Sequence, residues 1–262
     1  MVMVHTIDKL VSRLFGVVMK KFLLILLPLL GVLLASPVSA SEKDIRKTLQ
    51  ALDPNTPIQS IKPSKINGLY EVVIGTEVYY ASADGRYIFN GDIFDASTRE
   101  NLTSLTRGKI ALSILDKVGE SGMVIYEPKK VRATLTVFTD VDCPYCRKFH
   151  EDMPQHLANG IRVRYVMFPL RGLNSDVYRK EVSVWCSKDR KKAFNDAKAG
   201  RAIKQTECAN PIADNYILAQ KLGVNSTPTL MTDKGVLIPG YMPPAHLAAR
   251  LGLAPLKEAN NR

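Results

Sequence analysis

From residue 123 onward, apolar residues follow the patterns expected of strands alternating with helices. Runs rich in Val, Ile, Leu and Tyr predict strands over 123–128, 131–140 and 161–170, with an amphipathic helix between the last two. A strand, a helix and a further strand in this order form a βαβ unit. The remaining pattern predicts helices over 175–188, 190–199 and 211–222, a strand hairpin over 227–241, and a closing helix over 244–252.

The preceding segment has a different pattern. Residues 43–52 are amphipathic with helical spacing, and β-forming residues fill 69–75, 77–82 and 86–94, with the turn-forming pair Asp84-Gly85 before the third run. A mostly antiparallel sheet of roughly 60 residues buries too little surface to be stable alone. We therefore expect it to pair with a second copy of itself; packing against the second half of the chain is the alternative.

A helix is predicted between these two parts. Residues 101–118 carry Leu and Ile with helical spacing, and Gly108 weakens the first half by about 1 kcal/mol relative to alanine. The fold class is therefore α+β or α/β, with two folded parts and a linker helix. We expect a small N-terminal domain over 41–100, the linker over 101–120 and a larger domain over 121–262.

The N-terminus is typical of a secretory signal peptide. Two lysines precede the apolar run 22–35, and the small residues Val38-Ser39-Ala40 follow it. A membrane-spanning helix needs about 20 apolar residues, and this run is shorter and contains a proline. We expect cleavage after Ala40, so that 1–40 is removed; an uncleaved anchor or a lipid-modified terminus is the alternative. Residues 1–18 precede a second start candidate, Met19, and are interpreted as a start-site extension.

Composition narrows the function classes. The formal charge of +11 falls to +8 when residues 1–40, with four basic residues and one acid, are removed. The remaining lysines and arginines alternate with acids, without a basic cluster interleaved with aromatics, which argues against nucleic-acid binding. All four cysteines lie after residue 40, and export would place them in an oxidising compartment, where disulfides form and persist.

The motif Cys143-Pro144-Tyr145-Cys146 follows a predicted strand and opens a predicted helix. Free backbone N–H groups and the positive end of the helix dipole stabilise an anion there, so the pKa of Cys143 should fall well below that of a free thiol. Cys146 lies one turn further in. We predict that Cys143 attacks disulfides and that Cys146 resolves the product, while Pro144 stiffens the turn and Tyr145 covers the pair.

Other roles for this pair fit less well. A zinc site using Cys143, Cys146 and His150 lacks a fourth ligand at a typical spacing. Haem attachment needs a histidine directly after Cys146, where Arg147 stands. A purely structural bridge is the remaining alternative. We expect no metal and no cofactor.

Two further features agree with redox chemistry. Thr227-Pro228 precedes a predicted strand, and either a cis or a trans bond fits this position. Cys186 and Cys208 flank the helical segment, 22 positions apart. We expect them to bond to each other as a structural disulfide; a second redox pair or free thiols is the alternative.

Four stretches carry a family resemblance: TVFTDVDCPYCRKFHEDM, VRYVMFPLRGLNSD, VWCSKDRKKAFNDAKAG and LGVNSTPTLMTDKGVLIPGYMPP. They resemble the DsbC/DsbG family of periplasmic thiol:disulfide interchange proteins. The resemblance implies a thioredoxin fold with a helical insertion, a small N-terminal dimerisation domain and a V-shaped homodimer. It also implies disulfide isomerase and chaperone-like activity on misoxidised exported proteins, and a DsbD-like membrane reductase as partner.

The resemblance assigns roles to individual residues. Cys143 and Cys146 match the active pair, Thr227 and Pro228 the cis-proline element, Cys186 and Cys208 the structural disulfide, and Gly91 the dimerisation segment. The dipeptide between the active cysteines is more usual in DsbG-type members, whereas the second cysteine pair favours the DsbC type. A DsbG-like reductase of sulfenylated cysteines and a non-catalytic holdase chaperone therefore stay as alternatives.

Overall fold

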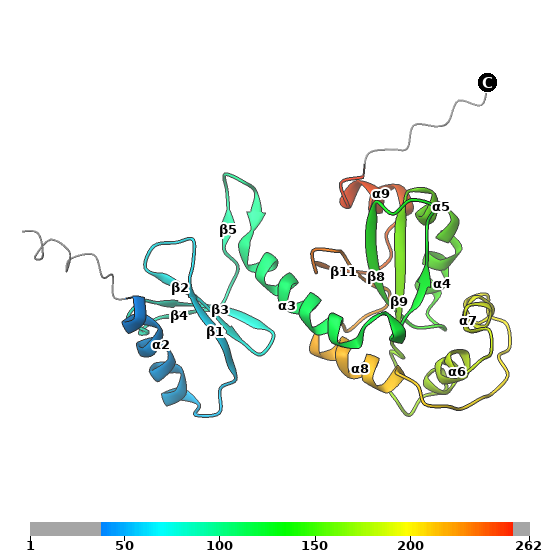
Figure 1. Ribbon diagram of the computed structural model, residues 1–262, viewed down its shortest axis with the longest axis horizontal. Coiled ribbons are helices and arrows are strands. Elements are labelled where there is room, and N and C mark those ends of the chain that lie inside the picture. Colours follow the sequence, from blue (N-terminus) through cyan, green and yellow to red (C-terminus); the bar gives the residue numbers. More distant parts are fainter. Residues whose placement is uncertain (1–37, 254–262) are drawn as a thin grey trace, which may run out of the picture. The chain divides into compact units, whose positions relative to one another are not determined.

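The computed structural model describes residues 38–253 (Figure 1). The chain divides into two compact units. The first unit consists of the chain up to Val72 together with Tyr80–Ile88. The second unit consists of Val73–Tyr79 together with the chain from Phe89 onward. The predicted signal peptide lies outside the described residues, except that Val38–Ala40 form the start of helix α2. None of the helices within residues 38–253 is long and apolar enough to cross a membrane.

The first sheet has four strands in the order β1-β2-β3-β4. Helix α2 contacts β1, and Ile45 and Leu49 on the helix are buried with Ile61 and Tyr80 of the strands. Gly85 has a φ of 69° in the predicted turn, and a Cβ there would lie 3.0 Å from the Thr48 hydroxyl of α2. The elements are α2 (Val38–Leu52), β1 (Ile58–Pro63), β2 (Leu69–Ile74), β3 (Glu77–Ser82) and β4 (Ile88–Phe89).

The predicted single strand over 86–94 was wrong. The chain forms β4, then bends, and β5 (Phe94–Asp95) pairs with β6 (Glu100–Asn101) instead. The cause lies after the bend, where Asp92 accepts hydrogen bonds from Asn101 Nδ2 at 2.6 Å and Arg107 Nη1 at 2.7 Å. These bonds tie the segment to the start of α3 (Leu102–Val118). The pattern also did not predict β1 or β6.

The predicted linker helix is α3, which begins at the N-cap Asn101, whose side chain accepts from Ser104 N at 2.9 Å. Gly108 is not a weak point in this helix. A Cβ there would collide with the carbonyl oxygen of Lys234, and one on Gly235 would collide with the Gly108 backbone. Glycine is therefore needed because two backbones cross in contact.

The second sheet has five strands in the order β11-β10-β8-β9-β7. Strands β8 and β9 run parallel, as the predicted βαβ unit requires, and the other neighbours are antiparallel. The strands are β7 (Val124–Tyr126), β8 (Ala133–Thr139), β9 (Ile161–Met167), β10 (Thr229–Met231) and β11 (Leu237–Pro239). The helices are α4 (Pro144–Glu151), α5 (Met153–Ala158), α6 (Asp176–Trp185), α7 (Arg190–Lys198), α8 (Ile212–Lys221) and α9 (Pro244–Arg250), with a 3₁₀ turn at Glu120–Gly122.

Helices cover both faces of this sheet. On one face Leu135 and Val137 of β8 pack with Phe149 and Phe194 from the helices, and on the other Phe138 packs with Leu115 of α3 and with α8. The active-site helix predicted as continuous is divided at Asp152 into α4 and α5. Pro154 explains the division, since it lacks the N–H that would bond to the carbonyl four residues earlier. The thioredoxin fold with a helical insertion is confirmed.

Candidate functional site

The two cysteines of the motif occupy different environments at the start of one helix. Strand β8 ends at Thr139, and after three residues Cys143 forms the N-cap of α4, with Pro144 as its first residue. Cys143 is half-buried, whereas Cys146 is completely buried. Tyr145 between them is 64% exposed.

Hydrogen bonds stabilise the ionised form of Cys143. The side chain of Cys146 contributes most, followed by Thr227 and the backbone N–H groups of Cys146 and Tyr145, and together they lower the pKa of Cys143 to about 5. Burial opposes them. A free cysteine has a pKa near 8.5, so this sulfur is a thiolate at neutral pH.

Cys146 has the opposite character. Burial raises the pKa of its thiol well above the ordinary value, and its hydrogen bond to Cys143 raises it further. The charge of Lys198 and a hydrogen bond with Thr139 act in the other direction. At rest, therefore, Cys143 carries the negative charge and Cys146 carries the proton.

The segment before β10 completes the surface around Cys143. Thr227-Pro228 is a cis peptide bond, and the Thr227 carbonyl oxygen lies 3.3 Å from Cys143 Sγ. The buried Thr227 hydroxyl has no other hydrogen-bond partner within the described structure, and its interaction with Cys143 stabilises the ionised sulfur. The site thus contains a thiolate, a backbone carbonyl and a hydroxyl within one small region.

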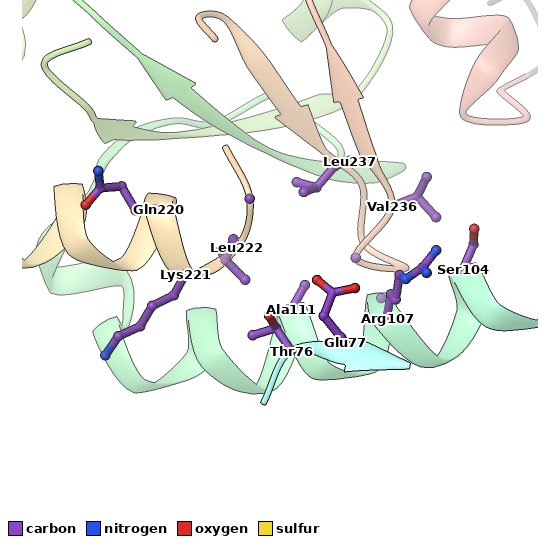
Figure 2. A pocket seen from close by; sticks show the side chains of 13 residues that line it. Thr76, Glu77, Ser104, Arg107, Ala111, Gln220, Lys221, Leu222, Val236 and Leu237 are labelled. Atoms are coloured by element: carbon purple, nitrogen blue, oxygen red, sulfur yellow. The ribbon is translucent and has the colours of Figure 1, made fainter. Parts of the chain in front are cut away.

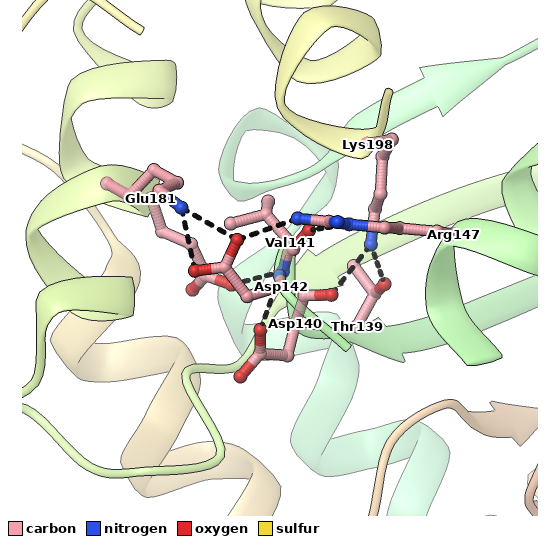
Figure 3. A network of polar contacts seen from close by, with 8 residues as sticks. Thr139, Asp140, Val141, Asp142, Arg147, Glu181 and Lys198 are labelled. Atoms are coloured by element: carbon pink, nitrogen blue, oxygen red, sulfur yellow. Dashed lines mark hydrogen bonds and ion pairs between the residues drawn. The ribbon is translucent and has the colours of Figure 1, made fainter. Parts of the chain in front are cut away.

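The charged side chains next to the motif form ion pairs with one another. Arg147 donates to the Asp142 carboxylate at 2.9 Å and to the Val141 carbonyl at 3.1 Å (Figure 3). Lys180 of α6 donates to both oxygens of Asp142 at 2.7 Å. The positive charge of Arg147 is balanced by Asp142. The thiolate depends instead on the neighbouring thiol and on backbone N–H groups.

Sequence reasoning did not identify three buried polar residues beneath the motif: Thr139, Glu181 and Lys198. Figure 3 shows Lys198 reaching from α7 to Thr139 and to the Asp140 carbonyl. A signal was present, because Lys198 follows Phe194 by four positions and therefore lies on the apolar face of its helix. Lysine is rarely found on the buried face of a helix.

Two other predicted groups lie elsewhere. Cys186, at the end of α6, forms a disulfide with Cys208, with a Cα–Cα distance of 5.6 Å. Gly91 lies in the exposed bend between β4 and β5, with open space around its Cα. The structure thus brings together Cys143, Pro144, Tyr145, Cys146, Thr227 and Pro228, and places Cys186, Cys208 and Gly91 outside this group.

A pocket of about 340 Å³ lies in the second unit, away from the cysteines (Figure 2). Its walls include Arg107 and Ala111 of α3, Leu222 after α8, and Val236 and Leu237 before and within β11. It contains no thiol and none of the predicted site residues.

The histidine considered as a metal ligand is occupied by other contacts. The His150 ring nitrogens lie 3.2 Å from the Tyr165 hydroxyl and 3.0 Å from Asn195 Oδ1. No group of three or more candidate metal ligands was found in the part of the chain that the structure describes.

Comparisons with known proteins agree with this geometry. Residues 120–254 match the model of a thioredoxin-like domain, and residues 36–104 match that of the disulfide bond isomerase protein N-terminal domain. The thiol:disulfide interchange protein DsbC of Escherichia coli K12 is 36% identical over 79% of this chain and 86% of its own length. The DsbC of Salmonella typhimurium is 37% identical, covering 85% and 92%.

A solved structure of a disulfide interchange protein from Neisseria gonorrhoeae is 28% identical, with a TM-score of 0.47, and covers 51% of this chain and 96% of that one. The matches to the two DsbC proteins, over 210 and 227 residues, are long enough to extend over both folded parts. The chain therefore belongs to the DsbC family of thiol:disulfide interchange proteins.

Proposed function

We propose that this chain, a thiol–disulfide oxidoreductase, rearranges incorrect disulfides in exported proteins, with Cys143 as the attacking and Cys146 as the resolving cysteine. One observation carries the proposal: the half-buried thiolate and the fully buried thiol lie one helical turn apart. A thiolate is the form that attacks disulfides, and its accessibility determines which of two cysteines reacts first.

The first step is attack on a client disulfide. The Cys143 thiolate forms a bond to one client sulfur, and the client S–S bond breaks. The other client sulfur leaves as a thiolate, which can attack a different disulfide of the same client. When a client thiolate then displaces Cys143 from the mixed disulfide, the thiolate of Cys143 is regenerated. This route rearranges bonds without net oxidation or reduction.

The second route is reduction. Cys146 loses its proton and attacks Cys143 Sγ, so that a Cys143–Cys146 disulfide forms and the client leaves as a thiolate. The client gains two electrons and the protein loses two. Repeated turnover by this route requires a reductant, and we assign that role to a DsbD-like membrane reductase.

Client binding in this proposal uses the surface beside Cys143. Tyr145 is 64% exposed and Leu170 is 43% exposed, while the backbone of Leu170 is fixed by a hydrogen bond from its N–H to Asp140 Oδ2 at 3.0 Å. Apolar side chains on a fixed backbone suit segments of incompletely folded proteins. Chaperone-like binding of such clients is part of the proposal.

We assign a homodimer to this function, with the segment around Gly91 at the interface. Strand β4 ends the order of its sheet, and Ile88 and Phe89 on it are 39% and 49% exposed. An unpaired strand edge with apolar side chains favours association. Sedimentation equilibrium should give twice the chain mass for the wild type and the single mass for Phe89→Lys. Export by the signal in residues 1–40, cleaved after Ala40, would place the dimer in the periplasm.

Refolding of scrambled ribonuclease tests the activity. Wild type should restore ribonuclease activity, Cys143→Ser should not, and Cys146→Ala should retain part of the rearranging activity while accumulating mixed disulfides. Equal recovery with Cys143→Ser would overturn the proposal in favour of a holdase. Mass spectrometry of the proteins trapped by Cys146→Ala separates the remaining alternative, since clients with a single cysteine would indicate reduction of sulfenylated thiols.

A further inference from the structure

Lys198 is a basic side chain that is buried in the protein interior. It is the last residue of α7, and only 3% of its surface is exposed. Its amine donates to Thr139 Oγ1 at 2.5 Å and to the Asp140 carbonyl oxygen at 2.9 Å. Neither acceptor carries a charge. Burying an ammonium group without a charged partner costs free energy. The neutral form of the amine is therefore more favoured here than it is in water.

Thr139 connects this amine to the active pair. Its hydroxyl is bonded to Lys198 Nζ and also forms a hydrogen bond with Cys146, the resolving sulfur. A hydroxyl can accept one proton while donating another. The last residue of β8 therefore links the buried thiol to the buried amine through a single oxygen atom, with no need for solvent.

Several ionisable groups surround Lys198. Burial lowers the pKa of Lys198, while Cys146, Glu181, Asp140 and Cys143 partly restore it. Burial also raises the pKa of Glu181 well above the ordinary value, so this carboxyl favours its neutral form. Its Oε1 accepts from Val141 N at 3.1 Å, and its Oε2 has no hydrogen-bond partner among residues 38–253. The rings of Phe194 and Tyr165 lie 5.2 and 5.8 Å from the amine. Burial lowers the pKa of His150 of α4, and the amine lowers it further whenever the amine is protonated.

We propose that Lys198 accepts the proton of Cys146, through the Thr139 hydroxyl, when Cys146 attacks the mixed disulfide. The inference rests on the proposed roles of Cys143 and Cys146. It adds a residue from the helical insertion to the chemistry of the pair. It also explains why a lysine occupies the apolar face of α7.

The transfer starts when the neutral amine of Lys198 turns its lone pair toward the Thr139 hydroxyl. The Cys146 proton then moves to Thr139 Oγ1, and the hydroxyl proton of Thr139 moves to the amine. The Cys146 thiolate attacks Cys143 Sγ, the Cys143–Cys146 bond forms, and the bond from Cys143 to the client breaks. The client sulfur leaves with the electron pair of that bond. When the disulfide is reduced again, Lys198 returns the proton along the same path.

The position of Glu181 makes it the competing acceptor. It lies on α6, and its bonded partner is the Val141 backbone, not Thr139. Because its pKa is raised, a carboxylate there would also take up a proton readily. The geometry favours Lys198, since only its amine is bonded to the hydroxyl that contacts Cys146. Variants of both residues therefore have to be compared.

Stopped-flow reaction of the reduced protein with a chromogenic aromatic disulfide separates the two cysteines. Attack by Cys143 releases the first aromatic thiolate at a rate proportional to reagent concentration, and attack by Cys146 releases the second at a rate independent of it. Lys198→Met should slow the second phase at least about threefold near pH 7, because loss of thiolate is only partly offset by greater nucleophilicity. The pH profile of that phase should move to higher pH. The first phase should stay within about twofold of wild type, as its thiolate does not depend on Lys198 for a proton.

Controls distinguish proton transfer from packing. Lys192→Met makes the same change on an exposed part of α7, where Lys192 pairs with Asp196, and should leave both phases unchanged. Thr139→Val keeps the side-chain volume and should slow the second phase as Lys198→Met does. In a Cys143→Ser background, near-ultraviolet thiolate absorbance should show a higher pKa of Cys146 after Lys198→Met, which also tests the inference if one variant folds poorly.

The outcomes are separable. If the wild type showed no first phase, the proposed function itself would be overturned. A normal first phase, with the second phase and its pH profile unchanged by Lys198→Met, would overturn this inference alone. This inference would also be overturned if Glu181→Gln slowed the second phase and Lys198→Met did not.

Discussion

The sulfur of Cys143 lies 3.3 Å from the carbonyl oxygen of Thr227, which is 84 positions further along the chain. This contact joins the head of α4 to the start of β10, and it exists because β10 pairs with β8, the strand that leads into the motif. The carbonyl oxygen can accept a hydrogen bond from the protonated thiol of Cys143, while N–H groups of the helix stabilise the ionised thiolate. The protonation of Cys143 is therefore set by groups from two distant segments.

The first prediction concerns the pH dependence of Cys143. Because hydrogen bonding lowers its pKa to about 5, alkylation by iodoacetamide should rise as pH passes through about 5 and level off below pH 7. The depressed pKa also stabilises the reduced protein above the pKa of an unfolded thiol, and this contribution is lost as pH falls through about 5. Mass spectrometry of the Cys143 peptide measures the rate, with Cys143→Ser as the blank. A midpoint near 8.5 would contradict the proposed thiolate.

The second prediction concerns the crossing of Gly108 and Gly235. A Cβ on Gly108 would collide with the backbone carbonyl of Lys234, which cannot move away as a flexible side chain could. Gly108→Ala should therefore lower the free energy of unfolding by about 1–3 kcal/mol, although alanine favours a helix by about 1 kcal/mol over glycine. Urea unfolding measures the change. Lys109→Ala, at an exposed position of the same helix, should change it by less than about 0.5 kcal/mol. Stabilisation by Gly108→Ala would show that the two backbones do not touch.

The third prediction concerns the disulfide between Cys186 and Cys208. It closes a loop with a sequence separation of 22, and the chain-entropy model gives roughly 3 kcal/mol for such a loop. The double variant Cys186→Ala/Cys208→Ala should lose about that much stability in urea and keep the first stopped-flow phase of Cys143. If the double variant instead abolished that phase while remaining folded, the bridge would belong to the redox chemistry.

The fourth prediction concerns Glu120, which accepts from two nitrogens of Arg162, at 2.5 and 2.8 Å, just after α3. Hydrogen bonding from Arg162 lowers the pKa of Glu120 to about 2. Its contribution is present above the ordinary carboxyl pKa and is lost as pH falls through about 2. Since the Glu120 side chain is 45% exposed, Glu120→Gln should cost no more than about 1 kcal/mol at neutral pH.

Thermal unfolding at pH 7 and pH 2 checks this prediction. The difference between Glu120→Gln and wild type should shrink at the lower pH, where the wild-type carboxylate is becoming protonated. Glu151→Gln, at an exposed position of α4, provides the matched control and should show no such pH dependence. An equal loss of stability at both values of pH would mean that the side chain acts through packing and not through its charge.

The sequence by itself determined the βαβ pattern, the position of the CxxC motif at a helix start and the asymmetry of its two cysteines. These depend on local periodicity and on the order of neighbouring residues, which the chain displays directly. The same reasoning failed for residues 86–94, where the β-forming run is interrupted because Asp92 binds Asn101 and Arg107.

Only the tertiary structure decided what surrounds the sulfur atoms. The Cys143–Thr227 contact, the crossing of Gly108 with the β10–β11 turn, and the chain from Lys198 through Thr139 to Cys146 each join segments far apart in sequence. Such contacts depend on which strands pair and which helix covers which face. Burial then changes the charge of a side chain, and no local pattern records how deeply a residue will be buried.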